Sequence, residues 1–379
     1  AWEKGKEMRI NATLTKRGNA ELMETKRDLT AQIEALEKEV YNPPVMLFID
    51  FETTTNLDQH YAYLVCAESY DDDDKFQVTC YGRECGKKLL DAIIEKYPEK
   101  DTIRLYAHNA AYDYRFLFQF LNGGIKDICR GKMLLTANGK YRGKRIELQD
   151  TYALIAKRLA SFGECFKLDV EKEIMPYDLY TEDNIQTRFI PIAKCIEAAT
   201  IQFRKINCHH QTSDDQLRLY LDQYRANIDK SNSWWISKND GNCVDIRKYS
   251  EWYCKKDVEV LKKGWLTFHD WMKGVTTLDI NEYCSLPQLA LDYMTKQGVF
   301  EGVYKVSGVV REFINMAMVG GRTMCANNEP DMVEGSVDDF DACSLYPSAM
   351  ERLGGFLKGK PKVLPSSRLS WCGIKKMDG

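Results

Sequence analysis

VMLFIDFETTT, residues 45–55, is the stretch that decides the fold. Its first five residues, 45–49, are an unbroken apolar run, which is typical of a strand buried on both faces. Because side chains alternate along a strand, Asp50 and Glu52 project to one side and Phe51 to the other. Two carboxylates this close repel each other unless a cation lies between them, and magnesium is the usual occupant. Alone, an Asp-x-Glu is more often an acidic strand end facing water.

Two later stretches supply partners for this pair. LYAHNAAYDYRFL, residues 105–117, is expected to form a short apolar strand running through Asn109 into Asp113 and then an aromatic-rich helix. In YSEWYCKKDVEVLKKGW, Tyr253 and Asp257 are four residues apart and therefore share one face of a helix. The order Asp-x-Glu, Asn-x-x-Tyr-Asp, Tyr-x-x-x-Asp resembles the three exonuclease motifs of proofreading DNA polymerases.

This resemblance implies a site for two metal ions, Mg²⁺ or alternatively Mn²⁺. Two ions about 4 Å apart would stabilise both the attacking and the leaving oxygen of a phosphodiester. Tyr253 would help to position the attacking water, and Thr53, Asn109 and Tyr112 would contact the substrate DNA strand. The metal ligands that the resemblance implies are Asp50, Glu52, Asp113 and Asp257.

Composition limits the class of protein, the number of domains and the cellular location that we expect. The chain has 379 residues, 44% hydrophobic and 29% charged, which predicts a soluble protein of two or three domains. It has no membrane-length apolar run and no signal-peptide pattern, and its 13 cysteines form no Cys-x-x-Cys pair. We therefore expect a cytoplasmic or nuclear protein of a host cell, neither secreted nor membrane-bound. The net charge of −3 means that DNA contacts must come from local basic surface.

The elements around the first motif predict the fold class. Residues 19–40 are typical of a charged helix, within a leader over 1–44. HYAYLVCAES and KFQVTCYG alternate like paired strands around the acidic turn 71–74, and a helix is expected from about Lys87 to Tyr97. Strand-strand-strand-helix-strand-helix resembles the order of a ribonuclease-H-like nuclease domain, so we expect an α/β (α+β) fold.

The segment that follows is more ambiguous. Residues 126–145 carry seven Lys or Arg around an expected hairpin at Ala137-Asn138-Gly139, which fits either an edge-protecting strand pair or a DNA-backbone contact surface. Lys172 and Tyr177 resemble a lysine-and-tyrosine element near the exonuclease site of the same family, but they also fit a plain loop.

A glycine pair near residue 320 lies in REFINMAMVGGRTM, which follows an amphipathic helix expected in SLPQLALDYM. It resembles the Tyr-x-Gly-Gly element that links the exonuclease and polymerase domains of these enzymes. Gly320 and Gly321 match it, whereas Met318 stands where tyrosine is usual. Paired glycines permit close approach to a DNA strand, and Arg322 would meet a phosphate. A simple turn is the alternative.

VDDFDACSLYPSAM, residues 337–350, is expected to form a strand over 337–340 that turns into a helix. It resembles the first catalytic motif of family B DNA polymerases. The resemblance implies that Asp341 holds the metal ions of the polymerase site and that amides around Ser344 and Leu345 bind the incoming deoxynucleoside triphosphate. Tyr346 would form the floor under the sugar. The alternative is an aspartate-capped turn without chemistry.

Together these motifs predict an N-terminal fragment of a family B DNA polymerase, since the chain starts at Ala1 without methionine and stops at Gly379 in mid-pattern. The expected exonuclease domain spans 45–275, with a helical insertion at about 181–248, and the linker and start of the palm span 276–379. The motif spacing favours the protein-primed branch, with primer-template and single-stranded DNA and a terminal priming protein as partners. A nucleic-acid-primed viral polymerase, a free-standing exonuclease and an inactive DNA-binding remnant remain alternatives.

Overall fold

The computed structural model describes residues 42–55, 60–208, 213–236, 242–304, 307–317 and 340–355, together with positions 332, 335 and 338. The chain divides into two units, Ala1–Ala290 and Leu291–Gly379. The charged helix expected over 19–40 lies outside the described residues.

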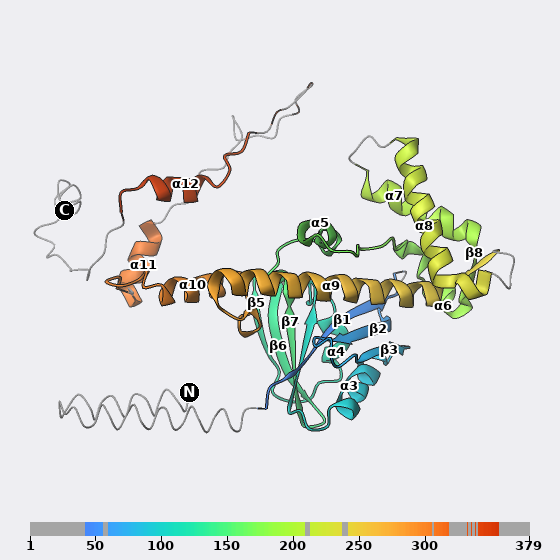
Figure 1. Ribbon diagram of the computed structural model, residues 1–379, viewed down its shortest axis with the longest axis horizontal. Helices are drawn as coiled ribbons and strands as arrows, with labels where there is room; N and C mark the ends of the chain where they lie inside the picture. Colours follow the sequence, from blue (N-terminus) through green and yellow to red (C-terminus); the bar gives the residue numbers. More distant parts are fainter. Residues whose placement is uncertain are drawn as a thin grey trace, which may run out of the picture. The chain divides into compact units, whose positions relative to one another are not determined.

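The first unit is built on one mixed sheet of seven strands, in the order β3-β2-β1-β4-β7-β6-β5 (Figure 1). The neighbours β1, β4 and β7 run parallel, and the other pairs are antiparallel. The α/β fold class expected from the sequence is confirmed. The strands are β1 Val45–Thr53, β2 Ala62–Ser69, β3 Gln77–Tyr81, β4 Thr102–Ala107, β5 Lys126–Arg130, β6 Met133–Tyr141 and β7 Lys144–Asp150.

Strand β1 has a different layer on each face, as its alternation predicts. Leu47, Ile49 and Phe51 belong to the hydrophobic core that also contains the buried side chains of helix α3 (Cys85–Lys96). Phe48 points the other way, where its ring lies 5.4 Å from that of Tyr106, which contacts Trp265 of helix α9 (Ile246–Thr276). Asp50 and Glu52 share the α9-facing side with Phe48.

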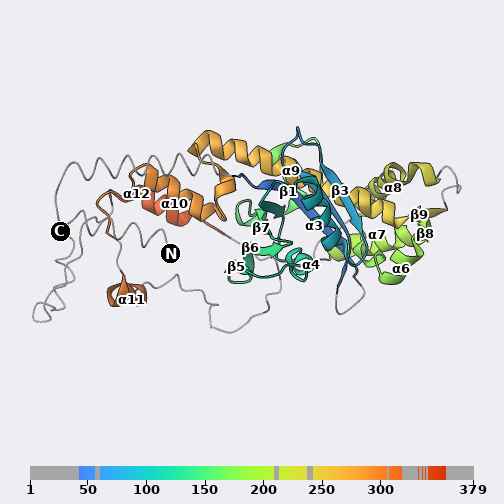
Figure 2. The ribbon, with the colours of Figure 1, turned by 90° about the horizontal axis from the view of Figure 1, so that it is seen from below.

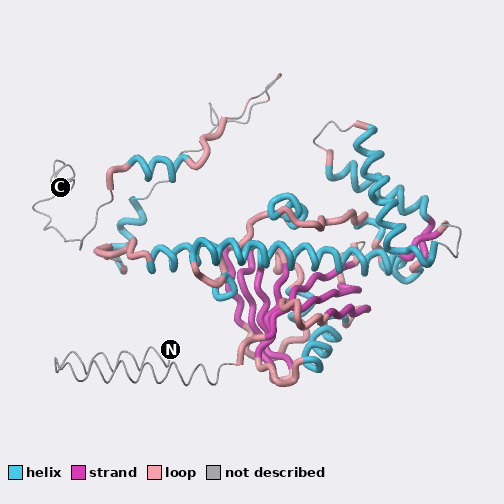
Figure 3. Tube along the Cα trace, in the orientation of Figure 1, coloured by secondary structure: helices cyan, strands magenta, loops and turns pink. Residues whose placement is uncertain are grey.

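Helix α9 is the longest element of the described chain, with 31 residues, and crosses one face of the sheet (Figures 1 and 3). Helices α6, α7 and α8 gather near one end of α9, beside the small two-stranded sheet of β8 Phe189–Pro191 and β9 Cys243–Asp245 (Figure 2). These three helices lie within residues 181–248, where the sequence predicts mainly helical structure. The helices of the first unit are α3 Cys85–Lys96, α4 Tyr114–Phe118, α5 Phe162–Phe166, α6 Glu182–Thr187, α7 Ile192–Ile206, α8 Asp214–Ile236 and α9 Ile246–Thr276, with α10 Leu286–Lys296 at the boundary between the units.

The prediction of a hairpin at Ala137-Asn138-Gly139 is wrong, because strand β6 continues through these residues. Asn138 pairs with β5 on one side and β7 on the other, so two ladders outweigh the local Asn-Gly turn signal. A Cβ added to Gly139 would lie 2.8 Å from Leu121 Cδ1, so this glycine serves close packing. The turn lies at Arg142 and Gly143, whose φ angles are both positive.

The second unit contains helices α11 Gly308–Ala317 and α12 Leu345–Arg352. The helix expected after Ser344 is confirmed by α12. Asp338 and Phe340, from the strand expected over 337–340, lie in neither a helix nor a strand, and Val337 and Asp339 lie outside the described residues. Across the part of the chain that the structure describes, no helix combines the length and apolar character needed to cross a membrane.

Candidate functional site

A cavity of about 350 Å³ lies at the carboxyl end of β1. Its walls come from β1, the turn before α4, the loop before α6, and α9. Most of the exonuclease residues expected from the sequence line it, although Asn109 and Asp113 do not. The lining residues are Asp50, Phe51, Glu52, Thr53, Thr55, His60, Tyr112, Lys172, Tyr177, Tyr253 and Asp257.

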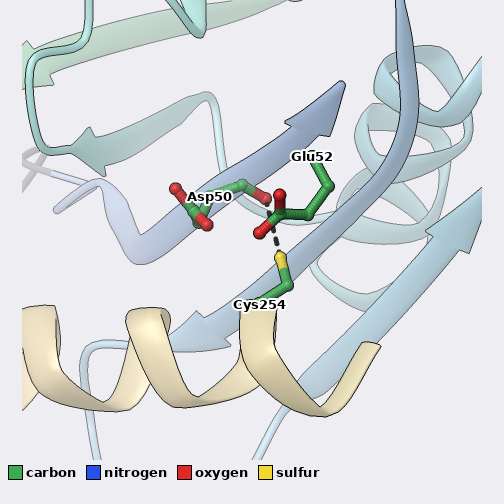
Figure 4. Close-up of side chains that lie close together, drawn as sticks. All are labelled: Asp50, Glu52 and Cys254. Atoms are coloured by element: carbon green, nitrogen blue, oxygen red, sulfur yellow. Dashed lines mark hydrogen bonds between the residues drawn. The ribbon is translucent and has the colours of Figure 1, made fainter. Parts of the chain in front are cut away.

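Helix α9 closes one side of this cavity. Tyr253 and Asp257, one turn apart, are 1% and 3% exposed. Between them, the thiol of Cys254 donates a hydrogen bond of 3.3 Å to the main-chain oxygen of Asp50. Figure 4 shows this thiol directed from α9 toward β1, below the carboxylates of Asp50 and Glu52. The motif helix is therefore held against the motif strand at the level of the carboxylates.

The turn between β4 and α4 supplies the fourth carboxylate. Strand β4 ends at Ala107, two residues earlier than the sequence suggests, and Asn109 adopts a left-handed φ of 64°. The backbone N–H of Asn109 donates to Asp150 Oδ1 over 2.9 Å, which fixes the turn. Asp113 follows as the residue before α4, and its Oδ1 accepts a hydrogen bond of 3.3 Å from Phe51 N. Asp113 is thereby tied to the backbone of β1.

The four carboxylates influence one another electrostatically. Burial, together with the charge of Asp257, raises the pKa of Asp50 to about 7. Burial and the charges of Asp50 and Asp257 hold the pKa of Glu52 well above its usual range. Burial and the charge of Asp50 do the same to the pKa of Asp113. The structure therefore brings residues from three distant segments into one cluster of negative charge.

Lys172 places a positive charge inside this cluster, where its ammonium group bonds to Asp257 Oδ2. Burial alone would lower the pKa of Lys172, but the carboxylates of Asp257 and Asp50 outweigh it and the pKa is raised. Close by, Tyr177 OH lies 3.1 Å from Tyr253 OH. From the sequence, Lys172 and Tyr177 fit either an element of the site or a plain loop. In the structure both line the cavity.

One rim of the cavity is formed by hydrogen-bonding side chains. Thr53 Oγ1 lies 2.5 Å from Tyr112 OH, and His60 Nδ1 lies 3.2 Å from the same hydroxyl. Asn109 is exposed, and its main-chain oxygen accepts a hydrogen bond of 3.1 Å from Tyr112 N. The rim offers hydroxyl, imidazole and aromatic groups, which can hydrogen-bond to or stack on a polar, planar ligand.

The donor set fits a hard divalent cation. Glu52 is only 6% exposed, and its carboxylate has no hydrogen-bond partner among the described residues. Asp257 Oδ1 is buried and also has no partner in the described part of the chain. Buried carboxylate oxygens without partners are costly unless a cation satisfies them, and oxygen ligands are those that Mg²⁺ prefers.

The residues expected at the polymerase site belong to the second unit. Asp341 is exposed, and Ser344 has a left-handed φ of 50° at the start of α12. Leu345 and Tyr346, in the first turn of that helix, are 60% and 69% exposed. Gly320, Gly321 and Arg322 lie outside the described residues.

Two residues at the site were missed by the sequence reasoning. Cys254 stands inside the Tyr-x-x-x-Asp motif, and only the approach of α9 to β1 reveals that its sulfur faces the carboxylates. His60 precedes β2 by two positions, and no motif marked it; only the fold brings its ring to the Tyr112 hydroxyl.

Comparison with known families decides the identity. Residues 95–354, which are 260 of the 379 residues, match the family described as DNA polymerase type B, organellar and viral. The chain belongs to this family. The match confirms the family B resemblance in the sequence. It begins after β1, so the place of Asp50 and Glu52 in the site rests on the geometry described above.

Individual relatives are distant. A DNA polymerase from Kluyveromyces lactis is 22% identical over 281 residues, which cover 71% of this chain and 26% of the relative. The chain thus spans about a quarter of the length of that relative. Phi29 DNA polymerase complexed with single-stranded DNA has 14% identity and a TM-score of 0.44, covering 75% of this chain and 41% of that one. Phi29 DNA polymerase complexed with primer-template DNA and incoming nucleotides has the same identity and TM-score, covering 76% and 41%.

Proposed function

We propose that residues 45–275 of this family B chain form a magnesium-dependent 3′-to-5′ proofreading exonuclease that serves a replicative DNA polymerase. The observation that carries the proposal is the convergence of Asp50, Glu52, Asp113 and Asp257 at one end of the sheet, three of them lining a single cavity. They come from three motifs that are far apart in the chain. No packing requirement explains why three buried carboxylates and one half-buried carboxylate should lie together, whereas a divalent cation site does.

The protein's own residues prepare the site for phosphodiester hydrolysis. Bound magnesium would supply Lewis acidity and an activated water for an in-line attack on the phosphate. Asp50, Glu52, Asp113 and Asp257 would hold it. Burial keeps the pKa of Tyr253 well above its usual range, so its phenol remains protonated and can donate a hydrogen bond to the attacking water.

Lys172 has two roles in this proposal. Its ammonium bonds to Asp257 and lies 4.9 Å from the centre of the Tyr253 ring, so it fixes two α9 side chains at once. Its charge would also stabilise the negative charge that develops on the phosphate. The Tyr177 hydroxyl then holds the Tyr253 hydroxyl in position.

The substrate strand would lie along the rim of Thr53, Tyr112 and Asn109. The linked hydroxyls of Thr53 and Tyr112 would bond to the terminal nucleotide, and the Tyr112 ring offers a stacking face for a base. A cavity of this size suits the end of a single strand rather than a duplex.

The test is degradation of a 5′-labelled single-stranded oligonucleotide by the purified chain. We expect the wild type to shorten it with Mg²⁺ and not with EDTA, and Asp50→Ala to lose nearly all of this activity while unfolding at an equal or higher temperature. Asp73→Ala, an exposed aspartate of the β2–β3 turn, is the matched control and should behave as wild type. Undiminished degradation by Asp50→Ala would assign the activity elsewhere.

The second part of the proposal is that Asp341, Ser344, Leu345 and Tyr346 belong to a DNA-directed polymerase site in the complete enzyme, with Gly320, Gly321 and Arg322 contacting DNA. Membership of the organellar and viral type B family supports this. Ser344, before α12, has a left-handed φ of 50°, and left-handed residues occur in backbone turns that bind anions through their N–H groups.

Protein priming is the most specific part of the proposal, and it rests on the motif spacing in the sequence. A polymerase that contains this segment, given labelled deoxynucleotides and no oligonucleotide, should attach the label to a protein. Label incorporated only after a DNA or RNA primer is added would instead support nucleic-acid priming.

A further inference from the structure

A thiol lies among the carboxylates of the site, and the proposed exonuclease has no use for it. Cys254 is fully buried on α9. Its Sγ, one oxygen of Asp50 and one oxygen of Glu52 all lie within 4.8 Å of one another (Figure 4). Within the described residues this is the one group of three or more His, Cys, Asp and Glu side chains whose ligand atoms all lie this close to one another.

The geometry favours a ligand role over simple packing. Burial of a cysteine alone is ordinary, since the thiol behaves as a small apolar group. Here, however, the sulfur faces Glu52, a carboxylate that is 94% buried and has no hydrogen-bond partner in the described chain. An apolar neighbour would leave that carboxylate unsatisfied, whereas a cation shared between sulfur and oxygen would satisfy both.

The mixed donor set discriminates between metals. Mg²⁺ takes oxygen ligands in octahedral geometry and gains nothing from sulfur. Zn²⁺ and Cd²⁺ bind thiolates strongly and accept carboxylates in the same four-coordinate shell, with metal–sulfur distances of about 2.3 Å for zinc. Ligand atoms up to 4.8 Å apart need only small side-chain rotations to surround such an ion.

We propose that Asp50, Glu52 and Cys254 form a binding site for a thiophilic divalent cation of the zinc class, distinct in its sulfur ligand from the all-oxygen magnesium site. Binding converts the thiol to a thiolate and releases one proton to solvent. It also replaces the hydrogen bond between Cys254 and the Asp50 main-chain oxygen with a metal–sulfur bond.

Occupation of this site would exclude magnesium. The two cations need the same two carboxylates, Asp50 and Glu52, so they compete. This consequence rests on the proposed exonuclease: a thiophilic cation at micromolar levels would stop hydrolysis, and an excess of Mg²⁺ would restore it. The binding itself does not depend on the exonuclease proposal, so the two can fail separately.

Direct binding is measured with Cd²⁺, whose bond to a thiolate absorbs in the ultraviolet. Wild-type chain, reduced and metal-free, is titrated with CdCl₂, and the difference spectrum against Cys254→Ser isolates the absorption of this one sulfur. Serine keeps a donor for the Asp50 main-chain oxygen, so the variant is expected to fold. We expect Cys254→Ser to lose one equivalent of the thiolate absorption that the wild type shows. Its affinity for Cd²⁺ should be lower than that of the wild type by at least about tenfold.

Two further variants make the result specific. Cys195→Ser removes a buried thiol on helix α7 that does not line the cavity, and should keep the full absorption. Glu52→Gln should weaken Cd²⁺ binding although every thiol remains. Millimolar Mg²⁺ and micromolar Zn²⁺ should each displace Cd²⁺ from the wild type.

Three outcomes would overturn the proposal. They are equal Cd²⁺–thiolate absorption in wild type and Cys254→Ser, loss of the absorption in Cys195→Ser instead, and Cd²⁺ binding unaffected by both Glu52→Gln and Mg²⁺. Loss of exonuclease activity is not used as a readout, so an inactive wild type would leave this test intact and would count only against the proposed function.

Discussion

The two faces of β1 are made from alternate residues of the same nine-residue strand, yet they differ in almost every physical property. On one face, Leu47, Ile49 and Phe51 join a close-packed apolar core with α3. On the other, Asp50 and Glu52 face α9 among charged and hydroxyl-bearing groups. Burial of the apolar face stabilises the fold, whereas holding the carboxylates together on the other face destabilises it.

The difference shows how such a site is supported. A buried cluster of like charges opposes folding, as the raised pKa values of Asp50 and Glu52 indicate. The apolar face of the same strand, only one residue away, offsets that cost. Variants on the carboxylate face should therefore lose activity and keep their stability, and variants on the apolar face should lose stability and keep their activity.

The largest effect is expected from Glu52→Gln. Exonuclease activity should fall by roughly a thousandfold or more, because the residues of such a site act as a unit. Stability without metal should stay equal or rise, because the pKa of Glu52 is raised by burial and by the charges of Asp50 and Asp257, and glutamine removes its charge. Initial rates on a 5′-labelled single strand and urea unfolding in EDTA measure the two quantities. A clear loss of stability would contradict this assignment of the two faces.

Ile49→Ala should do the reverse. This side chain is completely buried in the α3-facing core, so its truncation should cost about 2–5 kcal/mol of unfolding free energy. Activity per folded molecule, measured well below the unfolding temperature, should change little, since Ile49 does not line the cavity. If activity fell before the fold was lost, the separation of the two faces would be wrong.

Local patterns in the sequence were enough to predict the elements around the site. The apolar run and the Asp-x-Glu alternation gave β1 and its two faces, and the four-residue spacing of Tyr253 and Asp257 placed both on α9. These features depend on the period of a strand or helix, which neighbouring residues determine. The Asn138-Gly139 turn failed because pairing with two strands, a nonlocal effect, overrode the local preference.

Contacts between distant segments account for what remained unpredicted. Lys172 reaches Asp257 across 85 positions, and the thiol of Cys254 reaches Asp50 across 204. No spacing rule encodes such distances, because they follow from the packing of α9 on β1. Asn109 shows the same limit on a smaller scale: its left-handed turn is fixed by Asp150, 41 residues away.

The smallest effect concerns a titratable group in the layer of the sheet that faces α9. His108 is partly buried against Phe162, and its ring nitrogens lie 2.9 Å from Thr151 Oγ1 and 2.8 Å from the Lys157 carbonyl. Burial lowers the pKa of His108 from 6.5 to about 4. The unfolded chain therefore binds a proton that the folded chain does not between these two values. Stability should fall as the pH is lowered through this window.

A shift of this size corresponds to at most about 3 kcal/mol, and to less because the ring is partly exposed. His108→Gln keeps a donor for the Lys157 carbonyl but cannot titrate. The variant should lose about 1–2 kcal/mol less stability than wild type between pH 6.5 and 4, with both measured by urea unfolding in EDTA. Parallel pH curves for the two proteins would show that His108 titrates normally and that its surroundings do not exclude the charged ring. In that case, the carboxylate cluster alone would account for the electrostatic difference between the two faces of the sheet.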